Sequence, residues 1–348
     1  MEWDPTQFFR SDKDRPPRIP YAILVLNQPI NQRAFVAIRR HACFIVCADG
    51  GANRYYDLMK ARGKLDTDLP SAIVGDLDSI QPHVRKHYED RGVPVVHDPD
   101  QDSTDFTKCL KYLRAHAAEI VIKCRPPAQG GDMSLKEGQQ QQGQQQQRKR
   151  ARLDVLILGG LGGRVDQAFS QIHHLYAMTQ NQQQGEEDGE PSQEEEDEDN
   201  SRKQNDLYLI SEESISFVLQ PGKNTIYTPG TNRPGVEVPP PTAGGSPPPP
   251  PPPHQALPEE ESTTPANKIC AYDDYYLEEN VGIIPLCGPS EITLRGFEWD
   301  VTNWRTEIGG QISTSNHIRA DVVQVETNRP VLFTVELASR FKVGGRAR

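Results

Sequence analysis

The sequence lacks the features that mark secreted, membrane and nucleic-acid-binding proteins. Residues 1–18 contain no apolar run of the signal-peptide kind, and no stretch approaches the roughly 20 apolar residues of a membrane span. Lysine and arginine number 38 against 49 acidic residues, and ten of the acids fall in one run from Glu186 to Asp199. Outside that run the charges nearly balance, so we expect neither nucleic-acid nor membrane partners.

The chain is also poor in metal-binding cysteine patterns. Its six cysteines form no CxxC pair and have no histidine partners at zinc spacing, which argues against a structural zinc site. They are scattered through apolar segments, at Cys43, Cys47, Cys109, Cys124, Cys270 and Cys287. We interpret all six as buried, reduced thiols and expect a cytoplasmic protein.

Hydrophobic residues make up only 35% of the chain and mean hydropathy is −0.68, so part of the length is not expected to fold. Three segments are expected to be disordered insertions: a Gln- and Gly-rich stretch near 125–152 that ends in RKRAR, a Gln-rich and acidic stretch near 180–204, and a Pro-rich stretch near 229–265. The proline tract is also suited to an SH3-type partner and RKRAR to a nuclear signal, but solvated loops are the favoured interpretation.

Between these insertions, the first half alternates buried strands with helices. Strands are expected over 21–26, 43–49, 71–76, 93–98 and 153–160, and helices over 31–41, 52–62, 82–91, 104–117 and 166–179. This alternation is typical of a doubly wound parallel α/β sheet. From residue 207 onward short alternating strands without helices predict an antiparallel β-sandwich. We therefore expect a tail at 1–18, an α/β domain at 19–205 and a β-sandwich domain at 206–340.

The first two motifs follow predicted strands, at the sheet edge where α/β proteins bind ligands. In Asp49-Gly50-Gly51 the glycines permit close approach of a ligand, although Asp49 is equally suited to capping the next helix. Asp76 and Asp78 are spaced to serve one hard cation such as Mg²⁺, with an Asx turn as the structural alternative.

Two further motifs extend this edge. Four acids between Asp98 and Asp105 would repel one another without a cation, and Lys108 follows one helical turn later, where it suits either a phosphate or an ordinary ion pair. The glycine-rich stretch 159–163, followed by Arg164 and Asp166, is suited to surrounding phosphates, with a plain turn as the alternative.

Taken together, these motifs resemble the thiamine pyrophosphokinase family. The resemblance covers roughly 21–337 apart from the insertions and includes CADGGANRYYDL, IVGDLDSI, DPDQDSTDFTKCL and LGGLGGRVDQ, then GIIPLCGPSEITLRGFEWDVTNW and ISTSN. It implies an α/β catalytic domain, a β-sandwich domain and a homodimer with active sites between subunits. Gln167 departs from the histidine of many members, and we assign it no role.

The resemblance also implies the site residues. Asp76, Asp78 and Asp105 would bind Mg²⁺, with Lys108, Arg164 and Asp166 as further catalytic residues. The nucleotide and thiamine would contact Asp49, Gly50, Gly51, Asp100, Gln101, Thr104, Gly160, Gly163, Trp299, Ser313, Ser315 and Asn316. From pattern alone Trp299 would be a core aromatic, and only the resemblance makes it a ligand-binding residue.

The reaction implied is attack of the thiamine hydroxyl on the β-phosphorus of ATP, with AMP leaving. Either Asp166 or Asp100 would orient that hydroxyl or accept its proton. Two other functions are possible: a diphosphokinase acting on another alcohol such as a pterin, or a non-catalytic interaction protein using the Pro-rich and acidic segments. Trp299 and the STSN sequence argue against the first, and the intact carboxylates against the second.

Overall fold

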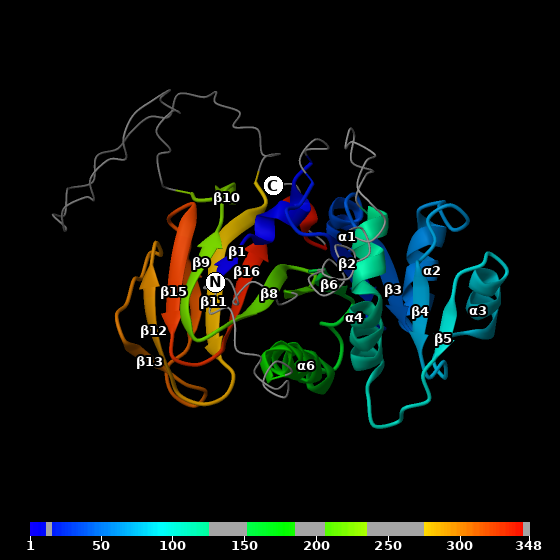
Figure 1. Cartoon of the computed structure of the whole chain (residues 1–348). Coiled ribbons are helices and arrows are strands. Elements are labelled where there is room, and N and C mark those ends of the chain that lie inside the picture. The colour runs from blue at the N-terminus through cyan, green and yellow to red at the C-terminus, as the bar shows by residue number, and fades with distance from the viewer. Residues whose placement is uncertain (12–15, 125–151, 185–205, 235–274, 344–348) are drawn as a thin grey trace, which may run out of the picture.

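The computed structural model describes residues 1–11, 16–124, 152–184, 206–234 and 275–343. The three expected insertions lie mostly outside these residues. Figure 1 shows a wide sheet that runs through the molecule, with helices around its right-hand half and a second sheet packed on its left-hand half. In the described residues no helix is both long enough and apolar enough to cross a membrane.

The first half folds as the expected doubly wound sheet. Its parallel strands lie in the order β6-β2-β3-β4-β5. These strands are β2 (Tyr21–Val25), β3 (Phe44–Ala48), β4 (Ala72–Gly75), β5 (Val95–His97) and β6 (Asp154–Leu158). The helices between and after them are α1 (Gln32–Ile38), α2 (Gly51–Ala61), α3 (Pro82–Glu89), α4 (Asp105–Cys124) and α6 (Val165–Gln184). Residues 119–124 (EIVIKC), an apolar stretch whose sequence suits either a strand or the end of a helix, are the end of α4.

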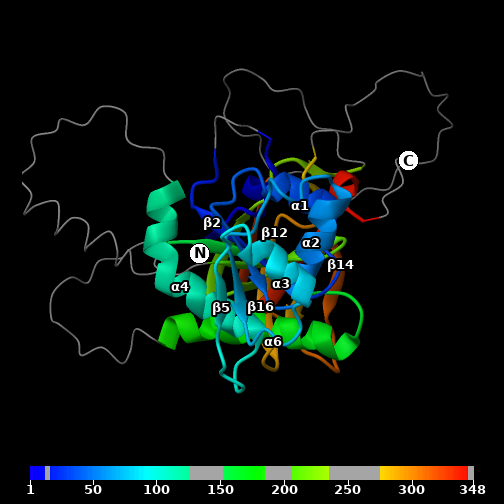
Figure 2. The same ribbon diagram turned by 90° about the vertical axis from the view of Figure 1, so that its right-hand side faces the viewer.

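Alternate residues of the central strands face two different helix layers. On β2, Ile23 packs in the cluster that contains α1, α2 and α3, whereas Leu24 packs in the cluster that contains α4 and α6. Figure 2 shows α4 on one side of the sheet and α1 to α3 on the other. Strands β2, β3, β4 and β6 are therefore buried on both faces, which explains why they are continuous apolar runs.

The second half adds strands to the same sheet. This sheet continues as β6-β7-β8-β16-β11-β10, with β7 (Leu207–Ile210), β8 (Ser214–Leu219), β16 (Val331–Leu337), β11 (Leu277–Pro285) and β10 (Thr231–Asn232), and β14 (Ser313–His317) pairs with β11. A second sheet, in the order β1-β9-β15-β12-β13, packs against it. It comprises β1 (Glu2–Trp3), β9 (Gly222–Tyr227), β15 (Val322–Thr327), β12 (Ser290–Arg295) and β13 (Trp304–Thr306). The two sheets form the β-sandwich.

Residues 1–9 belong to the fold, so the expectation of an N-terminal tail was wrong. Strand β1 pairs in parallel with β9, and the 3-10 helix η1 (Pro5–Phe9) is fully buried. The ring of Trp3 stacks on Phe217 with centroids 4.8 Å apart, and Phe8 contacts Tyr208 at 4.9 Å. These aromatic side chains fill the junction between the α/β part and the sandwich.

Four further expectations need correction. Strand β7 is parallel to β6, so antiparallel pairing begins only at β8. Helix α6 continues to Gln184 and β10 lies at 231–232, so both extend into stretches expected to be insertions. Residues 299–303, which alternate like the short strands expected from residue 207 onward, form a loop because Asp300 accepts hydrogen bonds from the backbone of residues 296 and 297. Residues 268–272 (KICAY), which we also expect among these short strands, lie outside the described residues.

The interpretation of all six cysteines as reduced thiols was also wrong. Cys43 and Cys124 form a disulfide with a Cα–Cα distance of 5.3 Å. Helix α4 starts at the carboxyl edge of the sheet and runs back over 20 residues, so its last residue reaches the amino end of β3. Cys47 and Cys109 are free and buried, as expected, and Cys287 is free but only partly buried. Cys270 lies outside the described residues.

Candidate active site

Three aspartates meet at the carboxyl edge of the central strands. Asp49 follows β3, Asp76 follows β4, and Asp105 is the first residue of α4. One carboxylate oxygen from each lies within 4.8 Å of the others. Strand β4 ends in a glycine here because a Cβ atom on Gly75 would lie 2.7 Å from Cβ of Asp49 and 2.9 Å from a carboxylate oxygen of Asp105. Adjacent parallel strands thus concentrate negative charge in one place.

Lys108 supplies the positive charge inside this group. Its side chain is fully buried, and its Nζ lies 3.1 Å from Oδ2 of Asp76 and 3.4 Å from Oδ1 of Asp105. Lys108 and Asp105 are three residues apart on α4 and share a face, as the sequence suggested. A single ammonium partly offsets three carboxylates, so the group remains net negative.

The carboxyl groups respond differently to this environment. Burial and the charge of Asp76 raise the pKa of Asp105. Burial alone would raise the pKa of Asp76, but hydrogen bonds from Lys108 and from the backbone of Asp78 outweigh it and lower that pKa. Burial alone would lower the pKa of Lys108, but the hydrogen bonds and charges of Asp76 and Asp105 outweigh burial and raise that pKa. Asp76 and Lys108 therefore form the charged pair, and the cluster disfavours the ionisation of Asp105.

Asp49 holds the loop that carries the other acids. It is fully buried, with a backbone φ of 38°, and its two oxygens accept hydrogen bonds from the backbone N–H groups of Ser79 (2.9 Å) and Ile80 (3.0 Å). Burial, followed by the nearby charge of Asp105, raises its pKa despite these bonds. Asn53 binds the same segment through the backbone of residues 79 and 81. Asp49 therefore fixes the position of the loop in addition to contributing charge.

Asp78 lies outside the three-carboxylate group. It is exposed, and its Oδ1 accepts a hydrogen bond of 2.7 Å from the hydroxyl of Ser79. Leu77, between the two aspartates of this motif, has a φ of 64°, which turns the chain sharply. Asp76 therefore faces the group while Asp78 lies on the solvent side of the same loop.

The acidic stretch before α4 forms a series of local turns. Asp100 accepts hydrogen bonds from the backbone of Asp102 and from the hydroxyl of Ser103. Thr104 accepts one from the backbone of residue 107 and so caps α4. Gln101 is exposed, and its side-chain amide donates to the backbone carbonyl of residue 99 at 3.5 Å. Of this stretch, only Asp105 reaches the carboxylate group.

The glycine-rich turn lies next to the loop after β2. A Cβ atom on Gly159, whose φ is 67°, would come within 2.7 Å of the carbonyl oxygens of Leu26 and Gln28. Only glycine therefore permits this close approach of the two loops. Arg164 and Asp166 form an exposed ion pair with each other, with 76% and 59% of their side chains accessible. Both remain free to reorient toward a ligand.

A cavity of about 270 Å³ lies between these loops and α6. Of the residues suggested by the sequence, Gly50, Thr104, Asp105 and Gly160 line it, whereas Gly51 and Gly163 do not. Its other lining residues are Leu26, Asn27, Gln28, Ala48, Ser79, Phe106, Gly159, Gln167, Ser170, Gln171 and His174. No residue of the second half lines it, within the part of the chain that the structure describes.

Sequence reasoning missed the contribution of α6 to this cavity. Gln167, Gln171 and His174 recur at helical spacing and share one face, a signal present in the sequence. The polar pair Asn27 and Gln28 directly after the β2 region was a second overlooked signal, because it marks another strand end at the same edge.

The residues expected to bind ligand in the second half form a separate group. Asn316 is buried and ties down the loop around Trp299, accepting from its backbone N–H at 3.1 Å and donating to its carbonyl oxygen at 3.0 Å. The Trp299 side chain is 53% exposed, so it is not the core aromatic that the pattern alone suggested. Ser313 and Ser315 lie with Asn316 on β14. The flanking strands β12 and β13 lie at the opposite side of the molecule from β4 and β5 (Figure 1).

A doubly wound sheet with a cavity and charged loops at its carboxyl edge is typical of α/β enzymes that bind nucleotides. Two family profiles match the chain: "Thiamin pyrophosphokinase, catalytic domain" over residues 35–185 and "Thiamin pyrophosphokinase, vitamin B1 binding domain" over residues 267–332. Together they cover more than half of the 348 residues. The chain belongs to the thiamine pyrophosphokinase family.

Individual relatives agree with this assignment. Thiamine pyrophosphokinase 1 of Oryza sativa subsp. japonica is 26% identical, covering 91% of this chain and 87% of its own length. Thiamine pyrophosphokinase of Saccharomyces cerevisiae is also 26% identical, covering 90% and 85%. Among solved structures, the yeast enzyme has a TM-score of 0.64 at 22% identity, covering 97% of this chain and 90% of that one. The Candida albicans enzyme has a TM-score of 0.63 at 21% identity, covering 97% and 92%. These structures support the fold described above.

Proposed function

We propose that this chain transfers the terminal diphosphate of ATP to the hydroxyl of thiamine, giving thiamine diphosphate and AMP. The observation that carries the proposal is the group formed by Asp49, Asp76 and Asp105, with Lys108 buried beside two of them at the carboxyl edge of the sheet. Family membership indicates the acceptor, because both relatives described above are named thiamine pyrophosphokinases.

The donor atoms of this group fit a magnesium ion. Mg²⁺ prefers oxygen ligands and is commonly held by one or two carboxylates together with phosphate oxygens. We propose Asp76 and Asp105 as ligands, with the exposed Asp78 on the same loop as the third. Both oxygens of Asp49 already accept backbone hydrogen bonds, so we assign it the positioning of this loop. A bound Mg²⁺ would neutralise phosphate oxygens and hold them for in-line attack.

The protein's own groups then complete the phosphate site. The buried ammonium of Lys108 would stabilise negative charge that develops on the transferred group, in surroundings that screen it little. The backbone of the turn at 159–160 lines the cavity and is suited to contact phosphate oxygens, and Arg164 is exposed beside it. Transfer would depend mainly on positioning and charge neutralisation, since no covalent intermediate is needed.

We infer that thiamine binds near Trp299 and β14 of a second copy of the chain. The exposed indole of Trp299 is suited to stack on a cationic aromatic vitamin, but no described residue of the second half lines the cavity beside the acids. On α6, beside that cavity, the apolar side chains of Val165 and Phe169 are 70% and 65% exposed. A homodimer would cover them and bring the two parts of the site together.

The test is direct. The purified full chain is incubated with ATP, Mg²⁺ and thiamine, and the products are separated by chromatography. We expect AMP and thiamine diphosphate in equal amounts, and neither product from an Asp105→Asn variant. Formation of AMP only when a pterin alcohol replaces thiamine would assign a different acceptor, and failure to form AMP with either acceptor would contradict the proposal.

A further inference from the structure

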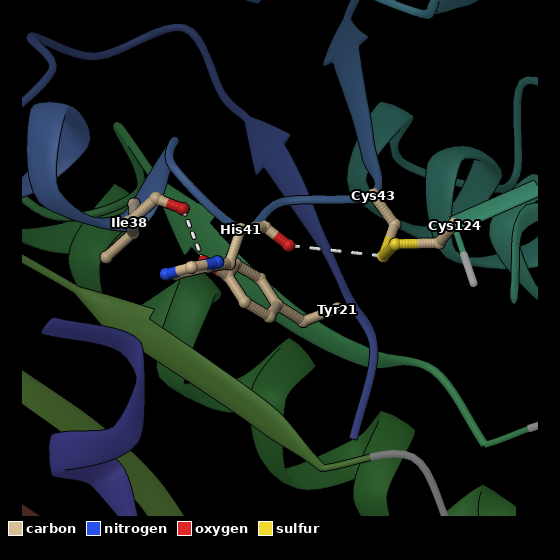
Figure 3. Close-up of a disulfide and its surroundings, with 5 residues drawn as sticks. All are labelled: Tyr21, Ile38, His41, Cys43 and Cys124. Carbon is tan, nitrogen blue, oxygen red and sulfur yellow. Dashed lines mark hydrogen bonds between the residues drawn. A yellow bond between two sulfur atoms is a disulfide. The ribbon is translucent and has the colours of Figure 1, made fainter. Parts of the chain in front are cut away.

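We propose that Cys43 and Cys124 form a reversible thiol–disulfide modification site that fastens the last turn of α4 to the amino end of β3. Figure 3 shows the bond between the residue that precedes β3 and the final residue of α4. The site lies at the amino ends of the strands, whereas the carboxylate group of the proposed enzyme lies at the carboxyl ends.

Accessibility singles out this pair for exchange with other thiols. Cys124 is exposed and Cys43 is partly exposed. Cys47 and Cys109 are fully buried, and burial raises the pKa of both thiols, so neither supplies a reactive thiolate. Cys287, the remaining cysteine in the described residues, is partly buried and unpaired. We therefore expect a reductant in solution to attack at Cys124, the more exposed residue of the pair.

The two partners differ in how firmly they are held without the bond. On the β3 side, the backbone N–H of Cys43 donates to the carbonyl of Tyr21 at 2.9 Å, and the Tyr21 hydroxyl donates to the carbonyl of Ile38 (Figure 3). The carbonyl oxygen of His41 lies 4.0 Å from Sγ of Cys43, close enough to receive a weak hydrogen bond from a released thiol. The backbone hydrogen bond therefore holds Cys43 in place with or without the disulfide, and the carbonyl of His41 can accept a hydrogen bond from the reduced thiol.

The α4 side depends on the bond. Ile120 and Val121 are the last residues of α4 in the core, whereas Ile122 is 55% exposed and Cys124 is exposed. Reduction therefore removes the covalent attachment of the final turn, while the core face of α4, from Phe106 to Val121, keeps the rest of the helix in place.

The exchange balances with a dithiol as the reductant. One thiolate of the dithiol attacks Sγ of Cys124, and the electron pair of the S–S bond leaves on Sγ of Cys43, which takes up a proton. The second thiolate then displaces Cys124 as a thiol and closes the reductant into a disulfide. Two electrons pass to the protein, and a small disulfide such as oxidised glutathione reverses the process.

The modification should act on stability rather than on the chemistry. The bond closes a loop with a sequence separation of 81 residues, and Asp49, Asp76, Asp105 and Lys108 all lie inside that loop. Closing so long a loop restricts the unfolded chain strongly. The oxidised form should therefore keep the phosphate-binding half folded at higher temperature, with unchanged turnover at moderate temperature.

The covalent state is tested by mass spectrometry. The full chain is treated with oxidised glutathione, alkylated and digested with trypsin without reduction. We expect the peptide 41–54 linked to the peptide 124–136, with fragment ions that place the bond on Cys43 rather than Cys47. After treatment with dithiothreitol the link should disappear, and it should return on renewed oxidation. Alkylation of both cysteines in the oxidised sample would overturn the proposal.

The consequence is tested by thermal unfolding of the same samples. The midpoint of the wild type should fall by about 10 °C on reduction. Cys124→Ser and Cys43→Ser should match the reduced wild type and no longer respond to dithiothreitol, whereas the control Cys287→Ser should respond as the wild type does. If dithiothreitol lowered the midpoint of Cys124→Ser by as much as it lowers that of the wild type, loss of the disulfide could not be the cause of the fall. Both readouts are independent of activity toward thiamine.

Discussion

Replacing the buried ammonium of Lys108 by methionine should weaken both the fold and catalysis. The side chain of Lys108 is fully buried and pairs with Asp76 at 3.1 Å and with Asp105 at 3.4 Å. Lys108→Met keeps most of the side-chain volume, so the change removes charge without opening a large cavity. The three carboxylates would then repel one another with no positive partner among them.

The structure provides a matched control one turn along the same helix. Lys111 also pairs with an aspartate, Asp100, but at 3.6 Å and with 58% of its side chain exposed. Breaking a buried pair costs about 3–5 kcal/mol, whereas an exposed pair contributes about 0–1 kcal/mol. At about 2–4 °C per kcal/mol, the unfolding midpoint should fall by roughly 6–20 °C for Lys108→Met and by at most about 4 °C for Lys111→Met.

The assay follows unfolding by circular dichroism with and without Mg²⁺, alongside AMP release. Because the carboxylates of Lys108→Met are uncompensated, Mg²⁺ should raise the midpoint more in this variant than in the wild type. Its kcat should fall on the order of 100-fold or more, and Lys111→Met should retain nearly full activity. Equal midpoints for the two variants, with no difference in their response to Mg²⁺, would refute the interpretation of Lys108 as the counter-charge of this group.

Three further predictions concern other parts of the molecule. Burial and the neighbouring charge of Asp154 raise the pKa of Asp206 to about 8. The stabilisation from protonated Asp206 should therefore be complete below about pH 4 and lost as the pH rises through 8, and urea unfolding should show a flatter pH dependence for Asp206→Asn. Replacing residues 240–264 by a short Gly/Ser linker should leave kcat unchanged, and a large loss would bring this stretch into the active site. Mixing inactive Asp76→Asn and Trp299→Ala chains should restore about a quarter of wild-type activity if sites are shared between subunits, whereas no recovery after verified subunit exchange would exclude shared sites.

The α/β half was predictable because its signals are local. Strands buried on both faces are continuous apolar runs, and the helices between them have apolar residues three or four positions apart. The order of the elements therefore follows from the sequence. The position of Asp49, Asp76 and Asp105 at one edge follows as well, because parallel strands in such a sheet place their carboxyl ends together. The sequence could not show that Asp76 joins the carboxylate group and Asp78 does not, because the turn at Leu77 decides the direction of each side chain.

What the sequence could not reveal depends on contacts between distant segments. The disulfide requires the length of α4 to match the distance back to β3, which no cysteine spacing encodes. Trp3 and Phe8 look like residues of a tail in the sequence, and only the folded chain places Trp3 against Phe217 and Phe8 against Tyr208. The stretch 299–303 alternates apolar and polar residues as a strand does, but Asp300 and the positive φ of Asn303 make it a loop.

The unbroken sheet also constrains how this enzyme can move. In the described residues, backbone pairing passes without interruption from β5 through β6, β7 and β8 to β10, so the two halves share one ladder of hydrogen bonds. Swinging one half against the other would break strand pairs, which is costly. If the chain binds ATP at this edge as proposed, closure around it would be left to short segments there, chiefly residues 98–104 and 159–164. Substrate access should depend on these loops, and substitutions that stiffen them should slow product release while leaving the sheet unaffected.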